Sequence, residues 1–96
     1  MSDVTIERRE HGDKGAYYAH VEGSHSLGRL TWVERDGVRV AEHTVVPPEI
    51  GGRGVAAQLV DALVADAREL GFKVKPVCSY VLKKFEEHPE WADLRA

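Results

Sequence analysis

"VVPPEIGGRGVAAQLVDALVADARELG", residues 45–71, contains the change of pattern that decides the fold. Two valines end at Pro47-Pro48, and glycines follow at positions 51, 52 and 54. Apolar residues then recur at intervals of three or four, at Val55, Leu59, Leu63, Ala67 and Leu70. This spacing predicts an amphipathic helix that begins after Gly54 and ends at Gly71, since glycine commonly follows the last turn of a helix. The stretch therefore predicts a strand, a glycine-rich turn and a helix in succession.

Four strands are predicted upstream of this helix. The first, around residues 4–9, alternates apolar and polar residues, and a turn-rich segment at residues 11–15 follows it. The next three β-like runs are AYYAHVEG, LGRLTWVE and VRVAEHTVV, at residues 16–23, 27–34 and 38–46. Asp36-Gly37 is typical of a tight hairpin, because both residues tolerate positive φ angles. We expect the four strands to be antiparallel, with the fourth ending at Val46.

The remaining chain predicts one more strand and one more helix. FKVKPVCS, residues 72–79, alternates apolar residues with lysines, whereas YVLKKFEEH, residues 80–88, indicates a short helix before a last turn that begins at Pro89. The order ββββαβα predicts an α/β fold of the α+β kind, with helices packed on a mixed, mostly antiparallel sheet. Without repeats or linkers, residues 1–96 are expected to form a single domain.

The composition is that of an ordinary soluble globular protein, with 43% hydrophobic and 30% charged residues. A net charge of -3 argues against nonspecific binding to nucleic acid. Cys78 is the single cysteine, so an internal disulfide is excluded. Because no signal-like N-terminus and no long apolar run are present, we expect a cytoplasmic protein that binds no membrane. The histidines show no metal-ligand spacing, and we expect no metal.

The glycine-rich turn before the helix has two interpretations. The first turn of a helix offers unpaired backbone N–H groups and the positive end of the helix dipole, which together bind phosphate. Glycines let such a backbone approach a bulky anion, and Arg53 can add a charged contact. Alternatively, the glycines only make a tight turn between strand and helix. The spacing by itself leaves both interpretations open.

Gly51-Gly52-Arg53-Gly54-Val55-Ala56, preceded by Val46-Pro47-Pro48-Glu49, resembles the acetyl-CoA pyrophosphate loop of the GNAT superfamily of N-acetyltransferases. That loop reads Gln/Arg-x-x-Gly-x-Gly/Ala. Gly54 and Ala56 match it, whereas Gly51 stands where the family usually has Gln or Arg, which removes one side-chain contribution to CoA affinity. The resemblance implies acetyl-CoA as co-substrate, with its pyrophosphate on residues 51–56 and its pantetheine paired with the backbone of Val45 and Val46.

Further motifs, in order, are similar to those of a small branch of this superfamily, the YjdJ-like or GNAT-like N-acetyltransferase domains. They are His43-Thr44, Pro76-Val77-Cys78-Ser79-Tyr80 and His88-Pro89-Glu90. The resemblance covers residues from about 43 to 94 and implies a fourth and a fifth strand that splay apart around the thioester. It also implies acetyl transfer to an amine, carried by a small molecule or a protein lysine. A catalytically weak or inactive CoA-binding or protein-interaction module is the alternative.

Three side chains are candidates for the chemistry. Cys78 lies where the resemblance places the thioester, and it could attack the thioester, with His43 as its base, or be a buried structural residue. Tyr80 could donate a proton to the departing CoA or only pack. Direct attack by the amine on acetyl-CoA is equally compatible with these residues. Tyr17, Tyr18 and Trp32 could instead stack on bases, but the acidic balance disfavours nucleic acid as a partner. The sequence leaves the oligomeric state open, and a monomer is plausible.

Overall fold

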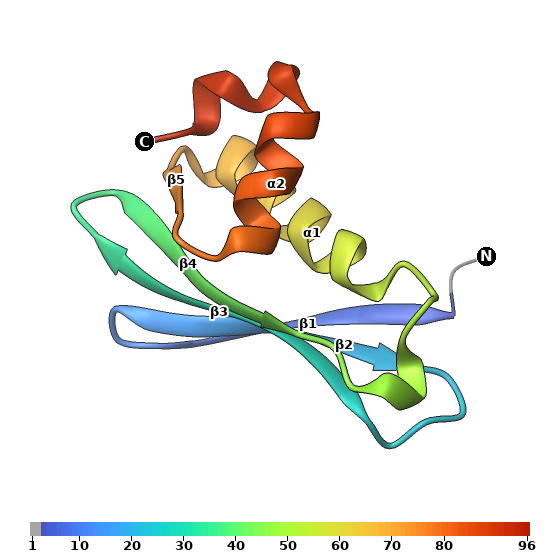
Figure 1. The fold of residues 1–96 in the computed structure, drawn as a ribbon. Coiled ribbons are helices and arrows are strands. Elements are labelled where there is room, and N and C mark those ends of the chain that lie inside the picture. Colours follow the sequence, from blue (N-terminus) through green and yellow to red (C-terminus); the bar gives the residue numbers. More distant parts are fainter. Residues whose placement is uncertain (1–2) are drawn as a thin grey trace.

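The computed structural model describes residues 3–96 and contains one five-stranded sheet in the order β1-β2-β3-β4-β5. The first four strands are antiparallel neighbours, and β5 pairs with β4 in parallel. The two α-helices and the C-terminal helical segment lie on one side of this sheet, and no helix covers the other side within residues 3–96 (Figure 1). We call that other side the bare side. The strands are β1 (Val4–His11), β2 (Lys14–Val21), β3 (Leu27–Arg35), β4 (Val38–Val45) and β5 (Lys73–Pro76). The predicted α+β fold with a mostly antiparallel sheet is therefore confirmed.

The turns between β1 and β2 and between β3 and β4 are tight, and each contains one or two residues with a positive φ angle. At Asp36-Gly37 the φ angles are 54° and 78°, which confirms the predicted turn. The predicted turn over residues 11–15 was too long, because His11 pairs with Lys14 and only Gly12 and Asp13 remain between β1 and β2. Cross-strand pairing thus continues closer to the turn than composition indicated.

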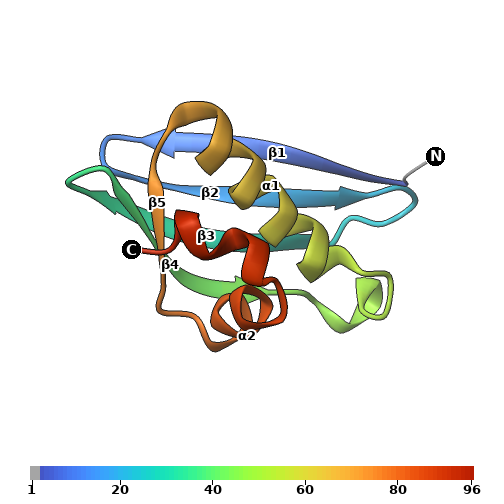
Figure 2. The same cartoon turned by 90° about the horizontal axis from the view of Figure 1, so that it is seen from above.

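Helix α1 (Val55–Leu70) packs its apolar face onto the sheet. Val55, Leu59 and Leu63 are fully buried there, against Leu30 and other core residues of β2 and β3. Gly28 allows this close approach, since a Cβ at its position would meet Val55 Cγ1 at 2.9 Å. Seen from above, α1 runs over the first three strands, while α2 lies beside β4 (Figure 2). The predicted end of α1 at Gly71 is confirmed by its left-handed conformation, φ 80°.

The C-terminal segments complete the same layer. They are α2 (Ser79–Glu87) and the 3₁₀ helix η2 (Pro89–Leu94), and another 3₁₀ helix, η1 (Pro48–Ile50), precedes the glycine-rich turn. The Trp91 ring packs edge-on against Phe85 at 5.3 Å and stacks on His88 at 4.1 Å. Strand β5 ends at Pro76, earlier than predicted, because the chain turns into α2. No helix within residues 3–96 is long and apolar enough to cross a membrane.

The side chain of Arg39 is buried on the part of β4 that pairs with β5. Its side chain is 6% exposed, and its guanidinium lies 3.9 Å from the Trp32 ring centroid and 4.2 Å from that of Phe72. It donates hydrogen bonds to the Tyr17 hydroxyl at 2.9 Å and to Glu10 at 2.8 Å. Its Nε also donates to Glu34 at 3.4 Å, so this buried charge is tolerated because its donors have partners on β1, β2 and β3. We call this part of the molecule, centred on Arg39, the closed end.

Tyr17 connects the closed end to α1. Its hydroxyl donates to Asp66 Oδ2 at 2.9 Å, and the same oxygen accepts from Arg8 Nε at 2.8 Å. Burial, followed by the hydrogen bond to Asp66, raises the pKa of Tyr17 well above its ordinary value. Tyr17 and Trp32 are 1% and 3% exposed, so these two aromatic residues belong to the core and offer no surface for stacking bases. Their burial weighs against base stacking on these two residues, which the acidic balance of the sequence already disfavoured.

Candidate functional site: the fork between β4 and β5

Strands β4 and β5 pair only along their first four residues and then separate. Val38–Ala41 face Lys73–Pro76 in parallel register. The carbonyl of Ala41 is the last acceptor that they share, receiving the backbone N–H groups of Val77 and Cys78 at 3.1 and 2.9 Å. Beyond it, β4 continues to Val45 with β3 on one side, while the chain after β5 enters α2. We call the diverging segments, residues 42–45 and 77–79, the fork.

A β-bulge in β4 stands at the start of the fork. Trp32 of β3 faces Ala41 and Thr31 faces His43, so Glu42 is the extra residue. The bulge shifts the alternation of side chains: Thr44 comes to face the buried Leu30 on the helix side of the sheet, whereas His43 faces Thr31 on the bare side. The sequence analysis missed Glu42 and did not assign a role to Thr44, because the position of the bulge depends on the register with β3.

The thiol of Cys78 lies in the fork, half-buried, with its Sγ 3.5 Å from Thr44 Oγ1. Cys78 also occupies the N-cap position of α2, without a side-chain capping hydrogen bond. Burial by itself would raise the pKa of this thiol, but the hydroxyl of Thr44 and the backbone N–H groups of Val81, Tyr80 and Thr44 outweigh it and lower the pKa. A larger fraction of Cys78 is therefore thiolate near neutral pH than in an unperturbed cysteine.

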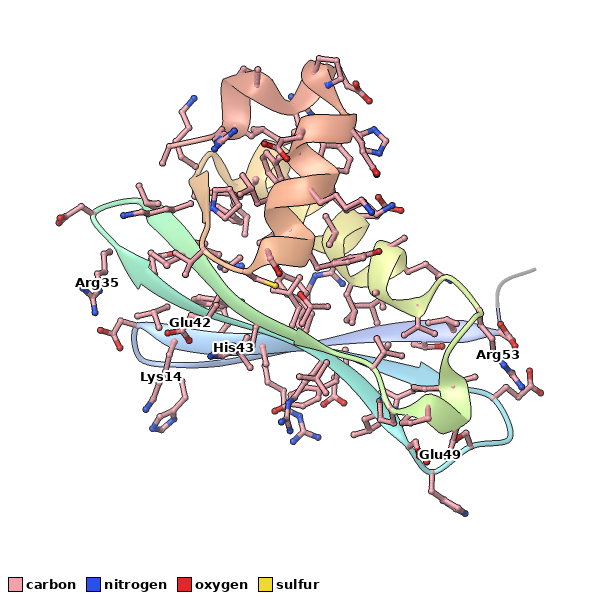
Figure 3. The ribbon with its side chains drawn as sticks, in the orientation of Figure 1. Lys14, Arg35, Glu42, His43, Glu49 and Arg53 are labelled. Atoms are coloured by element: carbon pink, nitrogen blue, oxygen red, sulfur yellow. The ribbon has the colours of Figure 1, made fainter. Side chains whose placement is uncertain are left out.

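His43 does not partner Cys78. The thiol's hydrogen bond is to Thr44, the next residue along β4, whose side chain lies on the opposite face of the sheet from that of His43. Figure 3 shows His43 on the bare side, away from the helices. The expected Cys/His pair is replaced by a Cys/Thr contact, because the bulge decides which neighbour faces the thiol.

Tyr80 occupies the first turn of α2 and is half-buried against the core. Within residues 3–96 its hydroxyl makes no hydrogen bond, and its ring lies 5.6 Å from the Lys84 ammonium. Its backbone N–H is one of the groups that lower the pKa of Cys78. Tyr80 is therefore close to the thiol in the chain and in space, as the sequence motif indicated.

The glycine-rich turn leads directly into α1 with its backbone uncovered. Gly52 and Gly54 have φ angles of 76° and 71°, and a Cβ at either position would meet no atom within 4 Å. The N-terminus of α1 has neither a side-chain cap nor an acidic residue in its first turn. Val55 is buried and fixes the helix to the sheet, while Ala56 is half-buried. The turn therefore has the free N–H groups and the open space that a pyrophosphate requires.

The residues on either side of this turn differ in exposure and in contacts. Val45, at the end of β4, is 44% exposed, whereas Val46 packs at the edge of the core. These two residues connect the fork to the turn. Arg53 is half-exposed and forms an ion pair with Asp3 at 3.3 Å. Gly51 has an ordinary extended conformation, φ -68°, which residues with side chains also adopt. A phosphate at the turn would compete with Asp3 for Arg53.

Comparison with known proteins identifies the family and the fold. The family model of the GCN5-related N-acetyl-transferases matches residues 16–94. The chain belongs to this family. The NMR solution structure of a GCN5-like protein from Staphylococcus aureus, itself only proposed to be an N-acetyltransferase, has a TM-score of 0.73 and 28% sequence identity, over 100% of this chain and 91% of that chain. No curated protein matches the sequence.

Membership of the GCN5-related family implies acetyl-CoA as acetyl donor, and the residues around the turn fit it. No group of three or more His, Cys, Asp and Glu side chains within residues 3–96 is arranged to hold a metal ion. The predicted cofactor loop and Cys78 lie at the same end of β4, joined by Thr44 and Val45. The chain thus runs from the thiol's partner Thr44 through Val45 to the turn, whereas His43 points away.

Proposed function

We propose that this protein transfers the acetyl group of acetyl-CoA to an amine, with the thiol of Cys78 as the group that accepts it first. The observation that carries the proposal is the fork, where an activated cysteine stands beside a strand edge that no other strand occupies. Membership of the GCN5-related family supports the acetyl donor. The N-terminus of α1, which has no side-chain cap, supports the placement of the pyrophosphate of acetyl-CoA at the glycine-rich turn.

The chain's own groups would hold the donor as follows. Backbone N–H groups from Gly52 to Ala56 bind the pyrophosphate, and Arg53 adds a charge-assisted contact. The free edge of β4 at Val45 and Val46 pairs with the pantetheine amides, as a further strand would. Acetyl-CoA supplies an activated thioester carbonyl when it is bound.

The transfer then has two steps that balance. The Cys78 thiolate attacks the thioester carbonyl carbon, a new Sγ–C bond forms, and the bond from the carbonyl to the CoA sulfur breaks. Tyr80, in the first turn of α2, gives the leaving thiolate a proton. The amine next attacks the acetyl group on Cys78, the N–C bond forms and the Sγ–C bond breaks. Solvent takes the proton that the amine loses. The Tyr80 phenolate is reprotonated from solvent.

Mass spectrometry tests this route directly. Incubation with acetyl-CoA and no acceptor should add one acetyl group, located on Cys78, and Cys78→Ala should lose nearly all transfer activity. Thiol release with an amine but without acetylated protein would show direct attack by the amine instead. In that case Cys78→Ala should cost only about 10-fold to 100-fold, the range for losing one proton donor or acceptor. Binding of acetyl-CoA without any thiol release would support the CoA-binding module.

A further inference from the structure

A second nucleophile, the hydroxyl of Thr44, stands directly beside the thiol of Cys78. The thiol donates its hydrogen bond to Thr44 Oγ1, and 3.5 Å separate Sγ from that oxygen. Because the hydroxyl oxygen is the acceptor, one of its lone pairs points at the sulfur. Within residues 3–96 no other side chain is hydrogen-bonded to this thiol. The contact therefore holds an oxygen nucleophile against the sulfur nucleophile.

An acetyl group on Cys78 would occupy the space between these two atoms. The carbonyl carbon of the thioester replaces the hydrogen that the thiol donates to Thr44, so the carbon is closer to Oγ1 than the sulfur is. Attack begins from separations of about 3–3.5 Å between reacting atoms when their orientation is fixed. The Thr44 oxygen thus lies within attacking distance of an acetyl group carried by Cys78.

Backbone pairing, and not the side-chain contact alone, keeps the two residues together. Thr44 is held in β4 opposite Leu30 of β3, and the backbone N–H of Cys78 donates to the carbonyl of Ala41 at 2.9 Å. Leu30 is fully buried, whereas Thr44 and Cys78 are half-buried. The oxygen therefore remains at the sulfur after the thiol hydrogen is replaced, and Leu30 shields one side of Thr44 from water.

We propose that Thr44 is a self-acetylation site, whose hydroxyl takes the acetyl group from Cys78 when no amine arrives. This proposal rests on the proposed acetyl transfer and adds a second covalent product to it. Thr44 Oγ1 attacks the carbonyl carbon, the Oγ1–C bond forms and the Sγ–C bond breaks. The proton of the hydroxyl passes to the departing Cys78 sulfur. A thioester is exchanged for an oxygen ester, and no other reactant is consumed.

The shift stops the transfer reaction. An oxygen ester is a weaker acyl donor than a thioester, so an amine that later reaches the fork does not recover the acetyl group from Thr44. The ester also removes the hydroxyl that stabilises the Cys78 thiolate. Thr44 would therefore inactivate the protein when the acetyl donor is present and the acceptor is absent.

Chemical stability distinguishes the two acetylated products. The protein is incubated with acetyl-CoA in an amine-free buffer, and samples are treated with neutral hydroxylamine, which cleaves thioesters and spares alkyl esters. Other samples are unfolded and treated with N-ethylmaleimide, which counts free thiols. Because Cys78 is the single cysteine, protein acetylated there has no thiol, whereas protein acetylated on Thr44 has one. We expect hydroxylamine-sensitive acetyl first, and then resistant acetyl with a free thiol, located on Thr44 by tandem mass spectrometry.

Variants of the two hydroxyl residues in the fork locate the shift. Thr44→Val keeps the branched shape without the hydroxyl, and should lower the ratio of resistant to sensitive acetyl at least about 10-fold. Thr44→Ser restores a hydroxyl and should restore the ratio. Ser79→Ala is the matched control, because it removes an exposed hydroxyl next to Cys78 in the chain that has no bond to the thiol, and it should leave the ratio unchanged.

The outcomes separate the shift from the transfer reaction. Acetyl on Cys78 that never becomes resistant, or resistant acetyl that persists in Thr44→Val, would overturn self-acetylation and leave the proposed transfer standing. Acetylation of Thr44 in Cys78→Ala would also overturn it, since the acetyl group would then come directly from acetyl-CoA. Binding of CoA without any acetylated protein would refute the thiol as first acceptor, and the shift with it.

Discussion

The closed end and the fork occupy the two halves of one strand, yet they meet opposite requirements. In the first half of β4, Arg39 lies between two aromatic rings and its donors reach carboxylates and a hydroxyl. In the second half, Glu42 has no ion pair within the described residues, and the Cys78 thiol beside Thr44 is half-buried. The same sheet is thus tied together at one end and left reactive at the other.

This difference indicates that contacts at the closed end hold β4 in position at the fork. A strand whose second half lacks a neighbour on one side loses hydrogen bonds that would otherwise hold it. The aromatic and ionic contacts of Arg39, and the link from Tyr17 to Asp66 on α1, hold the first half in position. Substitutions at the closed end should therefore affect stability, and substitutions at the fork should affect binding and reactivity.

The largest effect is expected from Arg39→Ala. It removes the guanidinium from between Trp32 and Phe72, leaves a cavity and deprives the Tyr17 hydroxyl of a donor. We expect a loss of about 3 kcal/mol in the free energy of unfolding, measured by urea denaturation. Arg39→Lys, which keeps the charge but not the planar stack, should lose less. If Arg39→Ala unfolded at the wild-type urea concentration, the closed end would not be what stabilises the sheet.

Gly54→Val tests the turn at the other end. A β-branched residue is strained at φ 71°, by about 1–3 kcal/mol, and its side chain occupies the space that a pyrophosphate needs. We expect CoA affinity, measured by calorimetry, to fall about 10-fold to 100-fold, with the fold retained. Gly51→Ala is the control in the same turn, because its φ of -68° suits alanine, and it should bind CoA nearly as the wild type does. Equal affinities for both variants would place CoA elsewhere.

Thr44→Val tests the contact that lowers the pKa of Cys78. The hydroxyl stabilises the thiolate, so its loss should raise the thiol pKa and reduce the thiolate fraction at neutral pH. We expect alkylation by iodoacetamide at pH 7 to slow about 3-fold to 10-fold, and its pH profile to move to higher pH. His43→Ala should leave both unchanged, since His43 lies on the bare face. The reverse result would restore the Cys/His pair.

The smallest effects concern Arg53 and Asp3, which are both about half-exposed. Arg53→Ala should weaken CoA about 2-fold to 5-fold and flatten the dependence of affinity on ionic strength, because an exposed charge contributes little and is screened. Asp3→Ala should strengthen CoA slightly, as it frees Arg53 from its partner. If Arg53→Ala kept the wild-type salt dependence, Arg53 would not contact the phosphates.

Much of the fold could be predicted from local pattern. Asp36-Gly37 predicted a hairpin because few residues tolerate two positive φ angles, and the spacing of Val55, Leu59 and Leu63 predicted α1 because it matches the helical period. The motif around Cys78 predicted that this residue precedes a helix near the thioester site. Family-specific residues, from Gly54 to Cys78, also predicted the GCN5-related fold that the comparisons show.

By itself, then, the sequence determined the order of the elements, the glycine-rich turn and the single cysteine, because each depends on residues that are neighbours in the chain. Only the tertiary structure decided which side chains lie on the same face of the sheet. The bulge at Glu42 turned Thr44 toward Cys78 and His43 away, and the pairing of β4 with β5 stopped at Ala41. The tertiary structure also buried Tyr17 and Trp32. On the bare face, the side chains of Lys14 and Arg35 have no ion pair within the described residues. These outcomes depend on register between distant segments, where a shift of one residue exchanges the two faces of a strand.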